Sequence, residues 1–410
     1  MNVLLMTLMY SPDTIAEVAR LSRDGLQNQI NSYQRAFISG IDQNLRQNEH
    51  LDILNALPVG VFPTRYRKLF LKGGMHGQRM RELGGVNLPW LKQQGRRIGA
   101  ERELLRWTAR DAANRTVLLY TLYLPYMQAI AAVKRKVPDL RACVIVTDLP
   151  NELGISSGRR GLLKRVEYAM GDKRIGLCAA FDGFVLLTEA MGEALPIAGK
   201  QSIVIEGLIL PNEKTEQGPA CGADLPEAEA LATQAPAVLY TGTLNQELGI
   251  DELLSAFADL PEYELWLCGK GDMETEIRRM AAQYPNIRFY GFVSQEEALR
   301  LQGRAAVLIN PRSPEGVFTR YSFPSKTLEY LRSGKPVLCR RLAGIPQAYD
   351  DYLYYIEKPG AAGIRDAVHG LLAQPPQARA QRGEAGRCYV LAHKNPRVQC
   401  ERLLAMLRGL

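Results

Sequence analysis

The feature that most constrains the fold is an alternation of short apolar runs with longer helical patterns, which occurs in both halves of the chain. In the first half the runs are NVLLMTLM, TVLLYT, ACVIVTD, GFVLLT and SIVIEG, and in the second they are AVLYTGT, YELWLCG, IRFYGF, AAVLINP, KPVLCR and LYYIE. Such alternation is typical of βαβ units, in which helices join parallel strands. The sequence therefore predicts an α/β protein with two Rossmann-like, doubly wound parallel-sheet domains.

The boundary between the domains is expected in residues 211–236, which are rich in Pro, Gly, Ala and Glu and have no strand pattern. We expect an N-terminal domain over 1–210, a C-terminal domain over 237–376, and a helical tail over 377–410 that returns to the N-terminal domain. In open α/β sheets ligands bind outside the carboxyl ends of the strands. Functional residues are therefore expected just after the strands, in a cleft between the domains.

One uncharged stretch, residues 116–133, approaches the length of a membrane-spanning helix. Pro125 and Gln128 interrupt it, and TVLLY has a strand pattern, so a strand, a turn and a helix are expected instead. The apolar start of the chain lacks a basic region and a cleavage signal, and is expected to be a buried strand. The seven cysteines indicate neither a zinc site nor a disulfide framework, which favours a reducing, cytoplasmic location.

The positive charge lies entirely in the N-terminal half. Residues 1–210 hold 28 Lys+Arg and 19 Asp+Glu, whereas the remainder holds 23 and 24. The cations cluster in 64–74, 91–107 and 158–174, with Leu, Phe, Tyr and Trp between them. Such a surface could meet an anionic membrane or a lipid-phosphate acceptor; the alternative is an ordinary solvated helix face. No nucleic-acid-binding module accompanies the cations, so nucleic acid is not an expected partner.

Two glycine turns follow strand patterns in the second half. Gly242 directly follows one strand, and Gly269 and Gly271 follow the next. Glycine lets backbone N–H groups approach a phosphate, and a helix N-terminus adds about half a positive charge. A glycine after a strand is also ordinary turn chemistry. Two such turns at the expected ligand edge favour a phosphate site.

The stretch YSFPSKTLEYLRSGKPVL, residues 321–338, carries a stronger signal. Pro324 suits the start of a helix, and residues 325–327 then offer N–H groups, two hydroxyls and the Lys326 ammonium at its positive end. Glu329, one turn later, could accept hydrogen bonds from a ribose diol. The alternative is a capped helix start with a solvated lysine.

These motifs resemble the nucleotide-binding domain of family 4 glycosyltransferases of the GT-B fold. YTGTLNQELGIDELLSAF, ELWLCGKGD, IRFYGFVSQEE and FPSKTLEYLRSGKPVL run in family order and at family spacing. A bacterial polysaccharide-synthesis subgroup is particularly similar, because its turn also reads YSFPSK, preceded by NPR and followed by GIP. The N-terminal half matches more loosely, through GLQNQINSYQRAF, VTDLPNELG and FDGFVLLTEAM.

The resemblance implies retaining, metal-independent transfer of a hexose from a nucleoside diphosphate sugar, linked to UDP, GDP or dTDP, onto a glycan or lipid-linked acceptor in surface polysaccharide synthesis. No cofactor is implied. The residues implied in donor binding are Gly242, Thr243, Gly269, Gly271, Val293, Tyr321, Ser322, Phe323, Pro324, Ser325, Lys326, Thr327 and Glu329. Gly25 and Gln27 match the family's early loop, which approaches the donor phosphate and the acceptor.

The chain departs from the family pattern in its charged donor residues. The family has two glutamates eight residues apart, and Glu329 matches the second, which contacts the ribose. The first, which contacts the transferred sugar, is Tyr321 here, so Glu315 or the backbone of 322–323 is expected to substitute. The Arg and Lys that the family places in its first glycine turn are Thr243 and Leu248.

Three cations could supply the missing charge, namely Lys326, Arg312 and Arg320, of which Lys326 has the best placement. Positive charge is needed there because cleavage of a sugar–diphosphate bond leaves negative charge on the departing phosphate. Lys326 and Glu329 are therefore candidate catalytic residues.

Asp148, at the end of a predicted strand, is the third catalytic candidate, because it could orient or deprotonate an acceptor hydroxyl. The alternative is a turn aspartate. Many relatives use a histidine from the N-terminal domain, but none of the four here follows a predicted strand. His76 lies in a predicted loop that could reach the cleft, although an exposed loop histidine is expected.

Two other functions remain open. A non-catalytic GT-B protein that binds nucleotide sugar or docks on a partner enzyme would tolerate Tyr321, Thr243 and Leu248. A nucleotide-sugar epimerase would act on the donor without an acceptor.

Overall fold

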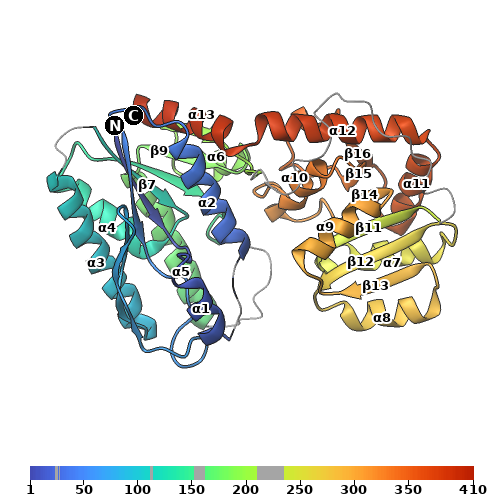
Figure 1. The fold of residues 1–410 in the computed structure, drawn as a ribbon, viewed down its shortest axis with the longest axis horizontal. Helices are drawn as coiled ribbons and strands as arrows, with labels where there is room; N and C mark the ends of the chain where they lie inside the picture. The colour runs from blue at the N-terminus through green and yellow to red at the C-terminus, as the bar shows by residue number, and fades with distance from the viewer. Residues whose placement is uncertain (24–25, 27, 111–113, 152–161, 210–234) are drawn as a thin grey trace. The chain divides into compact units, whose positions relative to one another are not determined.

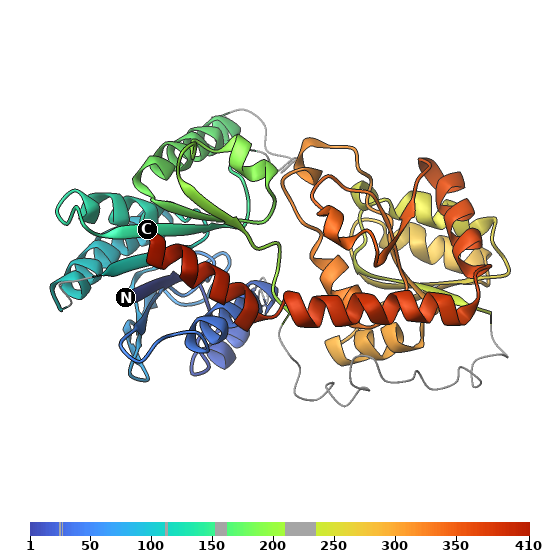
Figure 2. The same ribbon diagram turned by 90° about the horizontal axis from the view of Figure 1, so that it is seen from above.

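The computed structural model describes residues 1–23, 26, 28–110, 114–151, 162–209 and 235–410. The chain forms two compact units (Figures 1 and 2), of which unit 1 is Met1–Leu208 with Pro396–Leu410 and unit 2 is Ile209–Asn395. The expected linker, 211–236, lies almost entirely outside the described residues. The expected C-terminal tail, 377–410, is divided between the two units.

Unit 1 is built on an eight-stranded sheet in the order β10-β9-β8-β7-β1-β2-β5-β4. Its strands are β1 (Asn2–Thr7), β2 (His50–Asn55), β4 (Gly74–His76), β5 (Met80–Glu82), β7 (Arg115–Tyr120), β8 (Arg141–Val146), β9 (Gly183–Leu186) and β10 (Gln201–Val204). All neighbours pair in parallel except β4 and β5, which form an antiparallel pair at one edge. A separate antiparallel ladder joins β3 (Phe70–Leu71) to β6 (Gly85–Val86).

The helices of unit 1 are α1 (Ile15–Leu21), α2 (Asn28–Asp42), α3 (Pro89–Arg110), α4 (Leu124–Lys134), α5 (Leu162–Leu177), α6 (Ala190–Ala194) and α13 (Pro396–Gly409). Helices α2 and α13 pack together, and Phe37, Leu403 and Leu407 join alternate strand residues such as Leu5 and Leu118 in one core. The intervening strand residues are buried as well. The sheet is therefore covered on both faces, which explains why its central strands have continuous apolar sequences.

Unit 2 contains a six-stranded parallel sheet in the order β13-β12-β11-β14-β15-β16. The strands are β11 (Ala237–Thr243), β12 (Glu264–Lys270), β13 (Ile287–Gly291), β14 (Val307–Asn310), β15 (Val337–Arg340) and β16 (Leu353–Ile356). The helices are α7 (Ile250–Ala258), α8 (Glu274–Gln283), α9 (Gln295–Arg304), α10 (Ser325–Arg332), α11 (Gly360–Leu372) and α12 (Pro376–His393). Two hydrophobic cores lie in this unit, one including residues of α7 and α11 and the other residues of α10 and α12.

The predicted fold class is confirmed, since both units contain parallel sheets with helices between the strands. Residues 116–133 form most of β7 and α4, with Pro125 near the start of the helix, as expected. Among the described residues, no helix is long and apolar enough to span a membrane. The sequence-based prediction missed β2 and the short strands between residues 70 and 86, so His76 lies on β4 rather than in an exposed loop.

Candidate functional site

Helix α10 is held against strand β11 by a buried tyrosine. The Thr241 N–H donates a hydrogen bond to Oη of Tyr330 (2.8 Å), and that hydroxyl is 3.2 Å from the Thr241 carbonyl oxygen. Leu328 and Leu331 of the same helix lie in the core. These contacts fix the first turn of α10 beside the carboxyl end of β11.

Lys326 and Gly242, which lie far apart in the sequence, meet at this point. A Cβ placed on Gly242 would lie 3.4 Å from Cε of Lys326 and 2.9 Å from the hydroxyl of Tyr240. That hydroxyl donates to the carbonyl of Thr243 (2.8 Å). The structure therefore brings the lysine of the YSFPSK turn to the first glycine turn.

The second glycine turn packs directly on the first. A Cβ on Gly269 would lie 1.7 Å from the Gly242 carbonyl oxygen, and φ at Gly269 is +146°. A Cβ on Gly271 would lie 2.1 Å from the Leu244 carbonyl oxygen. Close contact between two adjacent turns thus requires both glycines, whatever else the turns bind.

Glu329 is held by two side chains. Its Oε2 lies 3.0 Å from Nζ of Lys326, and its Oε1 accepts a hydrogen bond of 2.9 Å from Nε2 of Gln302. Gln302 is buried on α9, and its own Oε1 has no partner among the described residues. Sequence reasoning missed Gln302 because a glutamine in a polar helix gives no sign of burial.

Arg312, in the loop after β14, is a second cation near the glycine turn. Its Nη2 donates to Oγ of Ser322 (2.9 Å), and its guanidinium carbon lies 4.6 Å from the centre of the Phe318 ring. Burial lowers the pKa of Arg312, and burial likewise raises the pKa of nearby Tyr240. Nε of Arg312 is buried without a partner among the described residues.

Other expected donor residues pack in or beside the core that contains α10. Phe323 is buried against Tyr349, and Val293 packs at the edge of the same core. Thr327 is fully buried and its N–H donates to the Pro324 carbonyl (2.8 Å), so its hydroxyl faces the interior. Pro324 occupies the N-cap position without a side-chain hydrogen bond, and Ser325 is the first residue of the helix. The guanidinium carbon of Arg320 lies 5.9 Å from the centre of the Tyr321 ring.

The two positions at which the sequence resemblance implies Arg and Lys are uncharged here. Thr243 is exposed at the end of β11, and Leu248 is half-buried in a short 3-10 helix before α7. The described cations near Gly242 include Lys326 in the first turn of α10 and Arg312 in the loop after β14, and Lys270 at the end of β12 pairs in register with Thr243.

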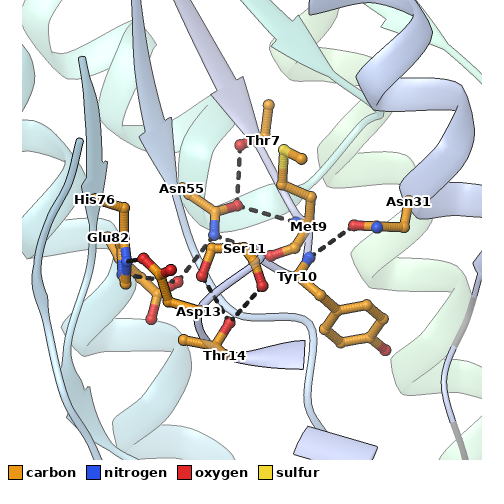
Figure 3. A network of polar contacts seen from close by, with 10 residues as sticks. All are labelled: Thr7, Met9, Tyr10, Ser11, Asp13, Thr14, Asn31, Asn55, His76 and Glu82. Atoms are coloured by element: carbon orange, nitrogen blue, oxygen red, sulfur yellow. Dashed lines mark hydrogen bonds and ion pairs between the residues drawn. The ribbon is translucent and has the colours of Figure 1, made fainter. Parts of the chain in front are cut away.

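Unit 1 has its own polar network at the carboxyl ends of β1 and β2 (Figure 3). Asn55 accepts from the Met9 N–H (2.9 Å), donates to the Met9 carbonyl (2.9 Å) and donates to Glu82 (3.2 Å). His76 lies between Asp13 (3.2 Å) and Glu82 (3.7 Å). Burial raises the pKa of Glu82. Sequence reasoning missed this network because β4 and β5 are too short and polar to be predicted.

The expected acceptor-side residues lie apart from that network in the chain. Asp148 is exposed just after β8, where its Oδ2 accepts from the Thr147 hydroxyl (3.2 Å). Gly25 and Gln27 lie outside the described residues. In the part of the chain that the structure describes, no group of His, Cys, Asp and Glu side chains could hold a metal ion.

Residues 223–388 match the family described as glycosyl transferases group 1. No curated protein matches the chain significantly. Solved structures resemble the whole chain at low identity. They include sucrose-phosphate synthase from Thermosynechococcus elongatus, with 17% identity, a TM-score of 0.61 and coverage of 100% of this chain and 99% of that one. The α,α-trehalose 6-phosphate synthase of Burkholderia multivorans has 12% identity, a TM-score of 0.61 and coverage of 100% and 98%.

HepE of Anabaena, solved in complex with UDP, has 14% identity, a TM-score of 0.58 and full coverage of both chains. At such identities these likenesses show the fold. The chain therefore has the GT-B fold, and its C-terminal half carries a domain that matches the glycosyl transferases group 1 family.

Proposed function

We propose that the protein is a retaining, metal-independent glycosyltransferase of family 4 that moves a hexose from a nucleoside diphosphate sugar onto a glycan or lipid-linked saccharide. Its setting would be bacterial surface polysaccharide synthesis, at the inner face of the cytoplasmic membrane. The observation that carries the proposal is the approach of Lys326 to Gly242 at the carboxyl end of β11, with Glu329 fixed by Gln302 one turn away.

Charge placement supports the role of Lys326. The leaving diphosphate gains negative charge as the sugar–phosphate bond breaks, and fixed donors near it lower the barrier without reorganisation. Lys326, the backbone N–H groups of Ser325 and Lys326 at the start of α10, and Arg312 would supply that positive field. Arg312 has lost part of its hydration through burial, so an anionic ligand would regain interaction energy for it.

Glu329 suits the neutral part of the donor. Each of its carboxylate oxygens already has one protein partner, and each oxygen has a second lone pair for a hydroxyl of the ribose. The carboxylate would thus anchor the nucleoside, while Lys326 acts on the diphosphate.

The acceptor would bind unit 1, where Asp148 is exposed at the end of β8. A carboxylate there would orient the attacking hydroxyl or accept its proton. HepE, which is similar in fold, was solved in complex with UDP, which makes UDP-sugars the first donors to test.

The test is to incubate the protein with UDP-, GDP- and dTDP-hexoses and a panel of saccharide acceptors, and to measure nucleotide release and the anomeric configuration of the product. Acceptor-dependent release that Lys326→Ala and Glu329→Gln abolish, and that the matched surface change Lys358→Ala leaves intact, would support the proposal.

Each alternative gives a distinct result in the same assay. Tight nucleotide binding without turnover would indicate a binding protein, a function that the uncharged residues Thr243 and Leu248 favour. Epimerised donor formed without an acceptor would indicate an epimerase. No binding and no turnover with any donor would overturn the proposal.

A further inference from the structure

The excess positive charge of the protein lies in one segment of unit 1. Residues 61–110 contain twelve Lys+Arg and three Asp+Glu, a net charge of +9, whereas the whole chain has a net charge of +8. The remaining 360 residues are therefore nearly neutral. The positive charge is therefore confined to a much shorter segment than the N-terminal half of the chain.

The same segment exposes large apolar side chains. Among the described residues, Phe70 is 66% exposed, Trp90 70%, Leu91 46% and Ile98 58%. Single exposed apolar residues are ordinary on protein surfaces. Together with Met75, which is 51% exposed, they make five within one strongly cationic segment, and such a group needs a specific explanation.

These side chains lie on connected elements. Phe70 on β3 is paired with Val86 on β6, and β6 packs against α3. Helix α3 begins three residues after Val86, so Trp90 and Leu91 lie in its first turn. Ile98 is two helical turns beyond Leu91 and on the same side of the helix. Helix α3 is the teal helix at the edge of unit 1 in Figure 1.

Cations without carboxylate partners stand beside these apolar residues. Arg67 and Lys72 flank Phe70 in the chain, and Arg97 precedes Ile98; none of the three forms an ion pair with a described residue. Other cations of the segment are neutralised, such as Arg79 by Asp42 and Arg106 by Glu103. The unpaired charges thus lie where the apolar side chains are exposed.

We propose that Phe70, Trp90, Leu91 and Ile98, together with Arg67, Lys72 and Arg97, form a docking surface for an anionic lipid bilayer. Aromatic and aliphatic side chains enter the boundary between headgroups and acyl chains, and cations bind the lipid phosphates. A nucleic acid would use the cations but would leave Leu91 and Ile98 in water. A lipid surface satisfies both kinds of side chain.

The inference rests on the proposed function only in one respect: a lipid-linked acceptor lies in the membrane, so docking would bring the enzyme to it. Its test needs no substrate. The full-length protein is mixed with vesicles of phosphatidylcholine alone, or with vesicles that also contain about 30% phosphatidylglycerol, whose anionic headgroups give the surface a negative potential. Binding is measured by co-sedimentation across a salt series. We expect binding to the anionic vesicles that weakens as salt rises.

Tryptophan fluorescence reports the site of contact. Of the three tryptophans, Trp107 is 4% exposed and Trp266 is 5% exposed, so a blue shift on vesicle binding should come from Trp90. Trp90→Phe should remove the shift while binding persists. A shift that survives in this variant would contradict the proposed surface.

Charge variants separate a specific surface from general attraction. The triple change Arg67→Gln, Lys72→Gln and Arg97→Gln should lower vesicle affinity by about 100-fold, since each cation contributes about one factor of five. The matched control, Arg278→Gln, Lys358→Gln and Arg365→Gln in unit 2, removes the same charge and should change affinity little.

Three results would overturn the proposal: no binding to anionic vesicles at low salt, equal loss in the two triple variants, or a concentration-dependent dimer that Trp90→Ser with Ile98→Ser dissolves. The last would identify the surface as an interface between copies of the chain. Circular dichroism of each variant shows whether it remains folded.

Discussion

Nζ of Lys326 lies 3.0 Å from Oε2 of Glu329, one turn further along helix α10. Both side chains are partly exposed, so the pair is screened by solvent and its contribution to stability is at most about 1 kcal/mol. An incoming diphosphate can therefore take over the ammonium at little cost. Glu329 would keep its hydrogen bond from Gln302 during that exchange.

Removing the Lys326 ammonium should slow catalysis. We expect Lys326→Ala to lower kcat/KM by roughly 100- to 1000-fold, as does loss of one fixed donor to a developing oxyanion. Steady-state kinetics with the best donor measures the change, and Lys358→Ala is the control. Unchanged kcat/KM would show that Lys326 is not part of the diphosphate site.

Removing the amide of Gln302 should weaken recognition of the ribose. Gln302→Leu leaves Oε1 of Glu329 without its 2.9 Å hydrogen bond, so the carboxylate is less firmly oriented. We expect KM for the donor to rise about 10-fold with little change in kcat. A positioning role further predicts a reduced preference for ribonucleotide over 2′-deoxyribonucleotide, measured by calorimetry. An unaltered preference would leave only a structural role.

Arg312 should act on the phosphates and not on the nucleoside. Arg312→Met preserves much of the packing against Phe318 but removes the charge beside Tyr240. We expect the affinity for nucleoside diphosphate to fall about 10-fold, while the affinity for the nucleoside stays the same. Equal losses for both ligands would point to a general disturbance of the loop.

Gly269 should not tolerate a side chain. In Gly269→Ala the new Cβ would meet the Gly242 carbonyl oxygen at 1.7 Å, and φ is +146°. We expect unit 2 to lose at least about 2 kcal/mol of stability in urea unfolding. Gly370→Ala is the control, because its Cβ would have no neighbour within 4 Å on α11; it should be neutral or stabilising by up to about 1 kcal/mol. Similar stabilities for both variants would contradict the close packing of the turns.

The contact between Glu49 and Arg408 should make unit 1 sensitive to acid. Hydrogen bonds from Arg408 lower the pKa of Glu49 from 4.5 to about 2. Because the folded pKa is lowered, the stabilisation is complete above pH 4.5 and is lost as pH falls towards 2. Glu49→Gln should cost roughly 2 kcal/mol at pH 7 and much less near pH 2. Thermal unfolding over this range measures it, and a constant difference would exclude the pair as its source.

Most of the strands that the sequence patterns predicted have apolar sequences because they are buried, as β7 and β8 are. Strand β11, AVLYTGT, begins with a buried apolar run and becomes polar only towards its carboxyl end. Strand β2, HLDILN, was missed because Asp52 interrupts the pattern, and in the structure that carboxylate accepts a hydrogen bond from Trp107 (2.8 Å). The strands β4 and β5 are three residues long, and their existence depends on a neighbouring strand.

In the candidate site too, some residues could be predicted from local sequence and others could not. Lys326 and Gly242 could be identified because glycine, proline and lysine at strand and helix ends have local physical causes. Gln302 and Glu82 could not, since their importance comes from burial and from partners distant in the sequence. The role of Asp148 stays a prediction that the acceptor assay tests.

Helix α13 has a consequence for how the chain is made. Cys400, Leu403, Leu404 and Leu407 fill the core of unit 1, yet they are translated after all of unit 2. On a ribosome the first unit to emerge is thus the last to complete its interior, and until then α2 and several strands keep apolar surface in water. The first unit to be synthesised thus depends for its interior on the last helix to be synthesised.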